Sequence, residues 1–189
     1  MDLSAEKAAL RKTVFAARKA AHATGTEAAL AVRDEFLRAG FAAGAEVIAA
    51  YRPIRTEIDP TPLMEALAAS GYRLAVPVIE GDGLPLRFAA WAPGSAMVAG
   101  AFGAEVPAQL DWVTPDLVVV PLVAFDRACW RLGYGGGFYD RSLEGLRAVR
   151  PTLAVGLAYA AQEVAAVPLE PTDQALDAIV TERGVLRRW

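Results

Sequence analysis

One short segment, residues 131–141, brings together the residue types that bind phosphate. It reads RLGYGGGFYDR and contains four glycines, Gly133, Gly135, Gly136 and Gly137. Glycine lets the backbone take a positive φ and approach a ligand closely, and successive N–H groups then form a concave site for an anion. Arg131 and Arg141 carry charge suited to phosphate, and Asp140 has the oxygens that Mg²⁺ prefers. The segment therefore predicts an anion site.

This segment matches neither of the common phosphate-binding motifs. No Lys-Ser or Lys-Thr pair follows the last glycine, as a P-loop requires. Phe138 stands where the dinucleotide fingerprint needs a glycine. The alternative is a glycine-rich turn that serves only tight packing. The spacing alone supports an anion site and nothing more specific.

The flanking residues show which elements must position this segment. The apolar run 117–123, LVVVPLV, is short and β-branched, so it predicts a buried strand. Residues 138–147 have apolar side chains at helical spacing and predict a helix. The glycines would thus lie in a strand-to-helix turn, where the helix N-terminus adds its positive dipole end.

The rest of the chain alternates helices and strands. We expect helices over residues 4–21, 26–39 and 59–70, a short helix at 162–164, and strands over 46–51, 72–78, 152–157 and 178–181. Residues 84–91 predict an edge strand, because Pro85 stands near its start. Residues 93–103 predict a glycine-rich loop. This order indicates an α/β fold in a single domain, residues 1–189, without repeats or linkers.

Three charged residues outside the turn are further candidates. Lys7 and Arg11 are four residues apart and share one face of the first helix. On composition alone, a solvated basic face explains them better. Glu57 follows the first strand, at the edge where open α/β sheets bind ligands, and the alternative is an ordinary loop carboxylate.

Composition sets the outer limits. The chain has 189 residues, of which 54% are hydrophobic and 22% charged, as in globular proteins. A net charge of −3 argues against broad nucleic-acid binding. Single cysteine and histidine residues, Cys129 and His22, exclude an intramolecular disulfide and disfavour a Cys- or His-based metal site. Because we find neither an apolar leader nor an 18-residue apolar run, we expect a cytoplasmic protein that does not enter the membrane.

Several motifs occur in an order typical of one family. They are KAALR at 7–11, EID at 57–59, FD at 125–126, the glycine segment, and DQALDAIVTERG at 173–184. On these, the chain resembles 5-formyltetrahydrofolate cyclo-ligases over nearly its whole length. The resemblance implies a single-domain, three-layer Rossmann-like sandwich with a mostly parallel central sheet, related to sugar-phosphate isomerase and CoA-transferase domains.

The resemblance also implies an activity and a site. The activity is the ATP- and Mg²⁺-dependent conversion of 5-formyltetrahydrofolate, with or without a polyglutamate tail, to 5,10-methenyltetrahydrofolate. We expect the protein to act as a monomer. ATP would contact Lys7, Arg11, Arg131, Leu132, Gly133, Tyr134, Gly135, Gly136, Gly137, Phe138 and Tyr139. The folate would contact Arg52, Glu57, Tyr134, Gly135, Gly136, Gly137 and Phe138. Asp140 and Asp173 would hold Mg²⁺.

The chain departs from the family pattern at a few positions. Cys129 stands where the family commonly has glycine, Phe138 replaces a tyrosine, and Thr172 replaces a histidine found in many members. Two alternatives remain open. One is a paralogue that acts on a different formyl or amide substrate. The other is a non-catalytic nucleotide- or folate-binding module, which should have lost a phosphate-binding charge or a magnesium carboxylate.

Overall fold

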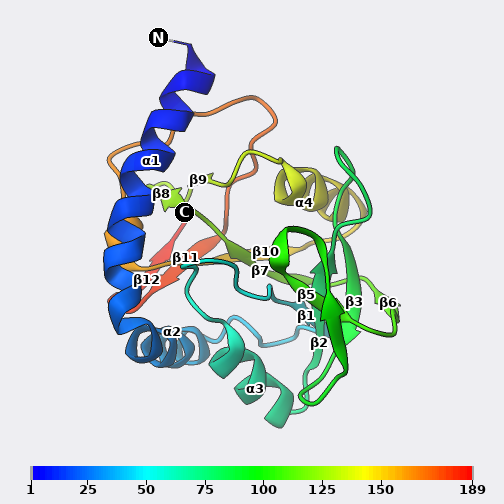
Figure 1. Cartoon of the computed structure of the whole chain (residues 1–189). Helices are drawn as coiled ribbons and strands as arrows, with labels where there is room; N and C mark the ends of the chain where they lie inside the picture. Colours follow the sequence, from blue (N-terminus) through cyan, green and yellow to red (C-terminus); the bar gives the residue numbers. More distant parts are fainter. Residues whose placement is uncertain (1, 189) are drawn as a thin grey trace.

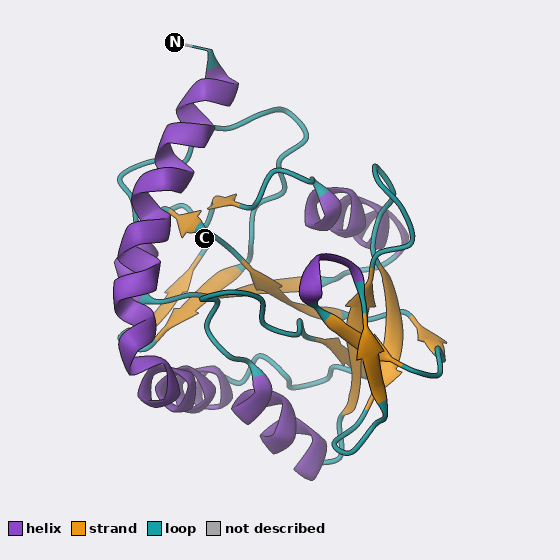
Figure 2. Cartoon of the chain, in the orientation of Figure 1, coloured by secondary structure: helices purple, strands orange, loops and turns teal. Residues whose placement is uncertain are grey.

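A computed structural model of the chain describes residues 2–188 as three layers, with a central sheet between helices (Figures 1 and 2). The sheet has eight strands in the order β12-β11-β10-β7-β1-β2-β3-β6. Its strands are β1 Val47–Ala49, β2 Arg73–Val78, β3 Arg87–Trp91, β6 Trp112–Val113, β7 Leu117–Pro121, β10 Leu153–Leu157, β11 Ala178–Thr181 and β12 Gly184–Arg187. The helices are α1 Leu3–Ala21, α2 Gly25–Ala39, α3 Thr61–Ala69 and α4 Phe138–Val149, with short 3₁₀ turns at His22–Thr24, Ala101–Gly103 and Ala160–Gln162.

The middle of the sheet is parallel, as the apolar runs predict. The strands from β11 through β10, β7 and β1 to β2 pair in parallel, and antiparallel strands border them on both sides. Parallel strands need helices on both faces and therefore read as continuous apolar runs. All parallel strands end at the same edge of the sheet, so the loops after them converge there.

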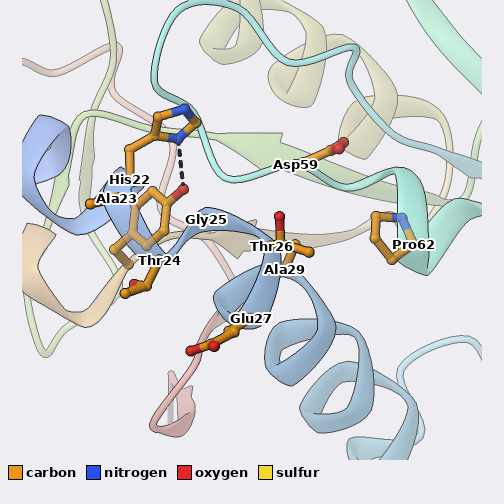
Figure 3. Close-up of a pocket in the computed structure, with 10 residues that line it drawn as sticks. His22, Ala23, Thr24, Gly25, Thr26, Glu27, Ala29, Asp59 and Pro62 are labelled. Carbon is orange, nitrogen blue, oxygen red and sulfur yellow. Dashed lines mark hydrogen bonds between the residues drawn. The ribbon is translucent and has the colours of Figure 1, made fainter.

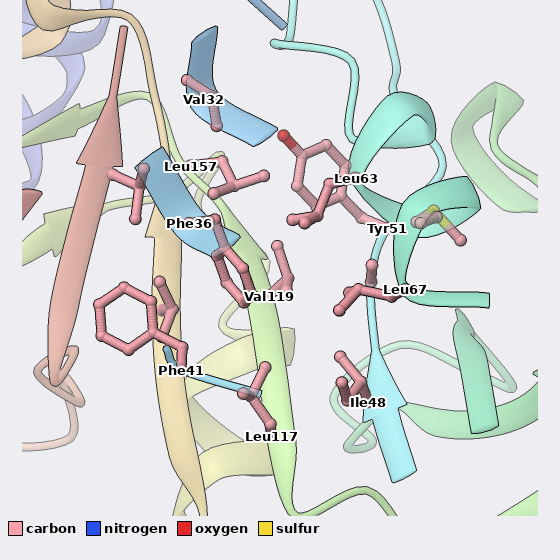
Figure 4. Packing of buried hydrophobic residues seen from close by; sticks show 14 of the residues in the cluster. Val32, Phe36, Phe41, Ile48, Tyr51, Leu63, Leu67, Leu117, Val119 and Leu157 are labelled. Carbon is pink, nitrogen blue, oxygen red and sulfur yellow. The ribbon is translucent and has the colours of Figure 1, made fainter. Parts of the chain in front are cut away.

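Two core clusters fill the space on the two faces of the sheet. On one face, Phe36 of α2 and Leu63 and Leu67 of α3 pack over Ile48 and Val119 (Figure 4). On the other face, Leu143 of α4 packs with side chains such as Val118, Val120 and Ile179. Alternate residues of one strand thus enter opposite clusters. The three-layer α/β expectation is confirmed.

Helix α1 packs on a separate, smaller cluster. Val14 is buried in one cluster with Val123, Ala124, Leu132 and Val167, which lie beyond the carboxyl ends of the strands. The helix therefore stands across the edge where the loops converge (Figure 1). Its inner face is available to a site at that edge. Asp2 caps this helix by accepting a hydrogen bond from the Ser4 N–H, so its first residue is Leu3 rather than Ser4.

Some expectations about strands are wrong. The segment 84–91 gives β3, but β3 lies between β2 and β6, so β6 forms the edge. The expected loop 93–103 contains β4, Met97–Ala99, which pairs with β5, Glu105–Pro107. Strand β12 follows β11, which was expected to be the last. Strands this short carry too little side-chain alternation to be recognised from the sequence.

A second small hairpin precedes the glycine segment. Strands β8, Ala124–Phe125, and β9, Arg131–Leu132, pair antiparallel between β7 and α4. The glycine turn thus follows β9 and not the buried strand directly. Cys129 lies in this hairpin with φ of 60°, a conformation that favours glycine. This agrees with the glycine that the family commonly has at that position. No helix in residues 2–188 is long and apolar enough to cross a membrane.

Candidate functional site

The glycine turn, residues 133–137, connects β9 to α4. Gly135 and Gly137 have φ of 104° and 65°, which other residues rarely adopt. Gly135 and Gly136 are exposed, and Gly137 precedes the first residue of α4 without a side-chain cap. The turn therefore presents backbone groups and a free helix N-terminus to the solvent, as an anion site requires.

Lys7 and Arg11 of α1 reach this turn and its surroundings. Lys7 Nζ lies 2.8 Å from both Glu170 Oε2 and Asp173 Oδ2, and the residue is only 7% exposed. Arg11 Nε donates to the carbonyl oxygen of Gly133 over 2.8 Å. Because Lys7 is buried and forms two ion pairs, the interpretation of Lys7 as part of a solvated basic face is wrong.

The carboxylates of Asp173 and Glu170 keep Lys7 in its protonated, positively charged form. Burial alone lowers the pKa of Lys7, but the hydrogen bonds and charges of Asp173 and Glu170 outweigh burial and raise it. Lys7 is therefore a positive charge held in place between two carboxylates. An incoming phosphate would compete with these carboxylates for the same ammonium group.

The two aspartates expected at the metal lie close together. Asp140 Oδ1 accepts hydrogen bonds from Arg131 Nη2 and from the N–H of Gln174, both over 2.9 Å. Asp173, which precedes Gln174, binds Lys7 and the N–H of Glu170 through Oδ2. Within residues 2–188, neither Asp140 Oδ2 nor Asp173 Oδ1 accepts a hydrogen bond. Each carboxylate thus keeps one oxygen for another ligand.

Glu57 lies at the same edge of the sheet and is 5% exposed. Its Oε2 accepts a hydrogen bond of 2.8 Å from the N–H of Ile54. Burial raises the pKa of Glu57, while the Ile54 N–H, the charge of Arg18 and the Tyr134 hydroxyl oppose the rise. Burial and the charge of Glu57 in turn raise the pKa of Tyr134 to about 12. The loop after β1 therefore meets the glycine turn.

Two arginines that contact Tyr134 were not among the site residues expected from the sequence. Arg18 Nη2 donates to the Tyr134 hydroxyl over 2.7 Å, and Arg55 lies with its guanidinium carbon 5.6 Å from the Tyr134 ring centre. Helical spacing held a signal for Arg18. It follows Lys7 by eleven residues, close to three helical turns, and so lies on the same face of α1.

Other expected site residues lie differently. Arg52 contacts Thr61 at the start of α3 and Glu105 of β5, and its guanidinium carbon lies 6.0 Å from the Trp91 ring centre. The side chains of Leu132 and Tyr139 pack into the core clusters. Phe138 stays near the turn, and its ring centre is 6.2 Å from that of Phe102. Leu132 and Tyr139 can therefore serve a ligand mainly through their backbone.

A separate cavity of about 430 Å³ opens between the start of α2 and the loop after β1 (Figure 3). Its polar lining residues are His22, Thr24, Thr26, Glu27, Asp59 and Tyr159. His22 Nδ1 and the Tyr159 hydroxyl are 3.1 Å apart within it. None of the residues expected to bind phosphate or metal lines this cavity, so it is distinct from the glycine-turn site.

Comparison with known proteins identifies the family. The model of the 5-formyltetrahydrofolate cyclo-ligase family matches residues 3–182. The 5-formyltetrahydrofolate cyclo-ligase of Escherichia coli K12 is 37% identical over 148 residues, 75% of this chain and 80% of the relative. The enzyme of that name from Mycolicibacterium smegmatis is 32% identical over 158 residues, 78% of this chain and 79% of the relative.

Two solved structures have the same fold. The 5,10-methenyltetrahydrofolate synthetase of Aquifex aeolicus matches with a TM-score of 0.79 and 30% identity, over 96% of this chain and 92% of that one. The synthetase of Mycoplasma pneumoniae matches with a TM-score of 0.73 and 25% identity, over 96% and 99%. The chain belongs to the 5-formyltetrahydrofolate cyclo-ligase family.

Proposed function

We propose that this chain uses ATP to convert 5-formyltetrahydrofolate to 5,10-methenyltetrahydrofolate, with release of ADP and phosphate. The arrangement of three contacts supports the proposal beyond family membership. Arg11 binds the glycine turn, Lys7 binds Asp173, and the turn meets buried Glu57 through Tyr134. Lysine and arginine side chains that could bind phosphate thus lie beside a buried carboxylate that could recognise the folate, at the carboxyl edge of the sheet.

The phosphate half uses charge and backbone N–H groups. The triphosphate of ATP would lie along the glycine turn and the start of α4, between Lys7 and Arg11. Arg131 is engaged by Asp140, so it would act mainly by holding that carboxylate in place. Charge-assisted hydrogen bonds of this kind are the strong ones, and they neutralise charge that develops during phosphoryl transfer.

Asp140 and Asp173 fit a magnesium ion that arrives with ATP. Each has one carboxylate oxygen without a hydrogen bond in residues 2–188, and no larger cluster of His, Cys, Asp or Glu there forms a full metal site. Magnesium suits such a site, because it takes one or two carboxylates and completes its shell with phosphate oxygens and water. The bound ion would neutralise phosphate charge.

The folate half centres on Glu57. A buried carboxylate can accept hydrogen bonds from the N–H donors of a pterin ring, and this would relieve its unfavourable burial. Arg52 lies farther out, toward β5, so it would contact a more distant part of the substrate. We also infer that the chain forms one domain and acts as a monomer, because one chain supplies all the residues of the proposed site.

The reaction needs positioning more than covalent catalysis. The formyl oxygen on nitrogen 5 is a poor leaving group. Transfer of the γ-phosphoryl group to that oxygen makes it a good one, and nitrogen 10 then attacks the formyl carbon, closes the ring and expels phosphate. In-line alignment and charge neutralisation account for most catalysis of phosphoryl transfer.

A coupled assay tests the proposal. The protein is mixed with ATP, Mg²⁺ and 5-formyltetrahydrofolate, and the methenyl chromophore and ADP are measured together. We expect one ADP for each methenyl product, and no product when ATP is omitted. ATP turnover only with another formyl or amide compound would favour the paralogue, and binding of both ligands without turnover would favour the non-catalytic module.

A further inference from the structure

Arg18 of α1 is a buried charge that the reaction described above does not use. It is 1% exposed, and no carboxylate in residues 2–188 forms an ion pair with it. Removing an arginine from water is costly unless its donors are satisfied. A methionine or leucine would fill the same space without this cost, so simple packing does not explain an arginine here.

The guanidinium group joins segments that are far apart in the sequence. Nε donates to Thr56 Oγ1 over 3.1 Å, in the loop after β1. Nη2 donates to the Tyr134 hydroxyl over 2.7 Å, in the glycine turn, and Nη1 points at the carbonyl of Leu122 at 3.5 Å, just after β7. The same group lies 5.4 Å from the centre of the Tyr134 ring.

Arg18 also lies near Glu57, because it donates hydrogen bonds to Thr56, the residue before Glu57, and to the Tyr134 hydroxyl. The charged and titratable groups around Glu57 come from several elements. They are Arg18 from α1, Tyr134 from the glycine turn, Tyr139 from α4, and Tyr51 and Arg55 from the loop after β1. Only the two arginines are positive. Arg55 is exposed, so water and salt screen its charge more strongly than that of buried Arg18.

We propose that Arg18 is a positioning residue for the folate half of the site: it fixes the Tyr134 hydroxyl against the Glu57 loop and places a permanent positive charge opposite the Glu57 carboxylate. The inference rests on the proposed function, in which Glu57 recognises the substrate. It assigns Arg18 to folate recognition, whereas its helix neighbours Lys7 and Arg11 serve the phosphates.

The test compares Arg18→Met, which keeps most of the volume, with Arg18→Lys, which keeps the charge but not the forked donors. Arg33→Met on α2 is the matched control, because the one ion pair of Arg33 within residues 2–188 is with neighbouring Asp34. For Arg18→Met we expect the KM for 5-formyltetrahydrofolate to rise about 10-fold or more and the KM for ATP to change less than about 3-fold. Arg18→Lys should lie between Arg18→Met and the wild type.

Two further measurements separate positioning from general stability. In Arg18→Met, the acidic limb of the pH profile of kcat/KM for the folate should move to higher pH, because Glu57 loses its buried counter-charge. In Arg18→Ala, added guanidinium ion at low, non-denaturing concentration should restore part of the folate affinity, and the same concentration of sodium chloride should not.

The following results would overturn the inference: equal rises in both KM values, an unmoved pH limb, or variants with a lowered Tm but wild-type folate KM. If Arg18→Met does not fold, the KM values for folate and for ATP are compared between Arg18→Lys and the wild type. Failure of the proposed function is seen separately, as a wild-type protein without turnover. In that case the folate dissociation constants of the variants and the wild type are compared in place of the KM values. A wild-type protein that binds no folate would refute both the role of Arg18 and the proposed function.

Discussion

The glycines of the turn are glycines for different physical reasons. Gly135 and Gly137 have positive φ. A Cβ on Gly136 would lie 2.7 Å from the Phe138 ring, so a side chain there would force this ring to move. Gly133 has neither constraint, because its nearest neighbour to a Cβ is Arg131 Nη1 at 3.7 Å. Nothing in the described protein requires glycine at 133, which makes it the sharpest probe of a ligand.

Gly133→Ala should leave the fold intact and weaken MgATP binding. If the phosphates approach the backbone at this position, the added methyl group obstructs them, and we expect the Kd to rise about 10-fold, or about 1.4 kcal/mol, by calorimetry. Gly145→Ala is the control, because it adds the same group on α4 with no atom within 4 Å. Wild-type MgATP affinity in both variants would show that Gly133 does not line the nucleotide site.

Asp140→Asn and Asp173→Asn should each raise the magnesium requirement. Asparagine keeps the shape and removes the charge, so we expect the Mg²⁺ concentration for half-maximal activity to rise about 10-fold or more. Asp177→Asn controls for loss of an ion pair, since Asp177 binds Arg147 over 2.8 Å. Unchanged magnesium dependence in Asp173→Asn would restrict the metal to Asp140.

Glu57→Gln should change how stability depends on pH. The pKa of Glu57 is raised in the folded state by burial, so folding favours its protonated form. Its contribution to stability is therefore complete below the pKa of the unfolded chain and is lost as the pH rises through the folded value. Glutamine resembles the protonated acid and does not ionise.

The Tm of Glu57→Gln minus that of the wild type should thus become more positive between about pH 4 and about pH 8. Thermal unfolding across this range measures the difference. Glu65→Gln, at an exposed position of α3, shows how much of the change comes from losing any carboxylate. A difference that stays constant or falls with pH would contradict the burial of a charged Glu57.

At the scale of elements, the paired strands β10 and β7 lie below the loops of the candidate site. Gly156 of β10 pairs with Val120 of β7, and a Cβ on it would lie 2.7 Å from methyl groups of Leu122 and Leu176. Both leucines are buried and cannot move away freely. The glycine thus allows the strand to pack closely under the loops that carry the site.

Gly156→Ala should destabilise the protein by about 1–3 kcal/mol, the usual effect of overpacking a core. Urea unfolding measures the loss as a lower midpoint with an unchanged slope. Calorimetry on the folded variant should still give the wild-type MgATP affinity, because no site residue is altered. A variant as stable as the wild type would mean that the two leucines repack.

For the whole molecule, binding should couple to folding. The residues proposed to bind phosphate come from both ends of the chain, because Lys7 is paired with Asp173 and Arg11 with the glycine turn. A ligand that bridges them stabilises only the folded state. At a free concentration of 100 times Kd, MgATP should add about 2.7 kcal/mol, which raises the Tm by about 5–10 °C for a domain of this size.

Thermal shift with and without MgATP checks this coupling. Arg11→Ala should reduce the shift, because it removes one cation from the phosphates while leaving the turn itself. Arg33→Met, away from the site, should keep the full shift. If saturating MgATP did not change the Tm of the wild-type protein, nucleotide binding by the folded chain would be refuted.

The sequence by itself determined the main helices and the central strands, and it singled out the glycine turn as a candidate site. Runs such as Leu117–Pro121 identify the central parallel strands, because buried strands are apolar along their whole length. The expected ends of α2 and β11 agree with the structure to within one residue. The glycine turn was recognisable because its chemistry is contiguous. These features depend on side-chain pattern over a few residues, which a sequence displays directly.

Only the tertiary structure decided which side chains meet. Lys7 and Asp173 are 166 residues apart, and Arg18 and Tyr134 are 116 apart. No local pattern encodes such pairs; they follow from α1 standing across the edge where the parallel strands end. The short hairpins β4–β5 and β8–β9 were missed for a related reason. Their strands are stabilised by pairing with each other and by packing against the rest of the fold. A pattern of two or three residues is too short to predict either kind of contact.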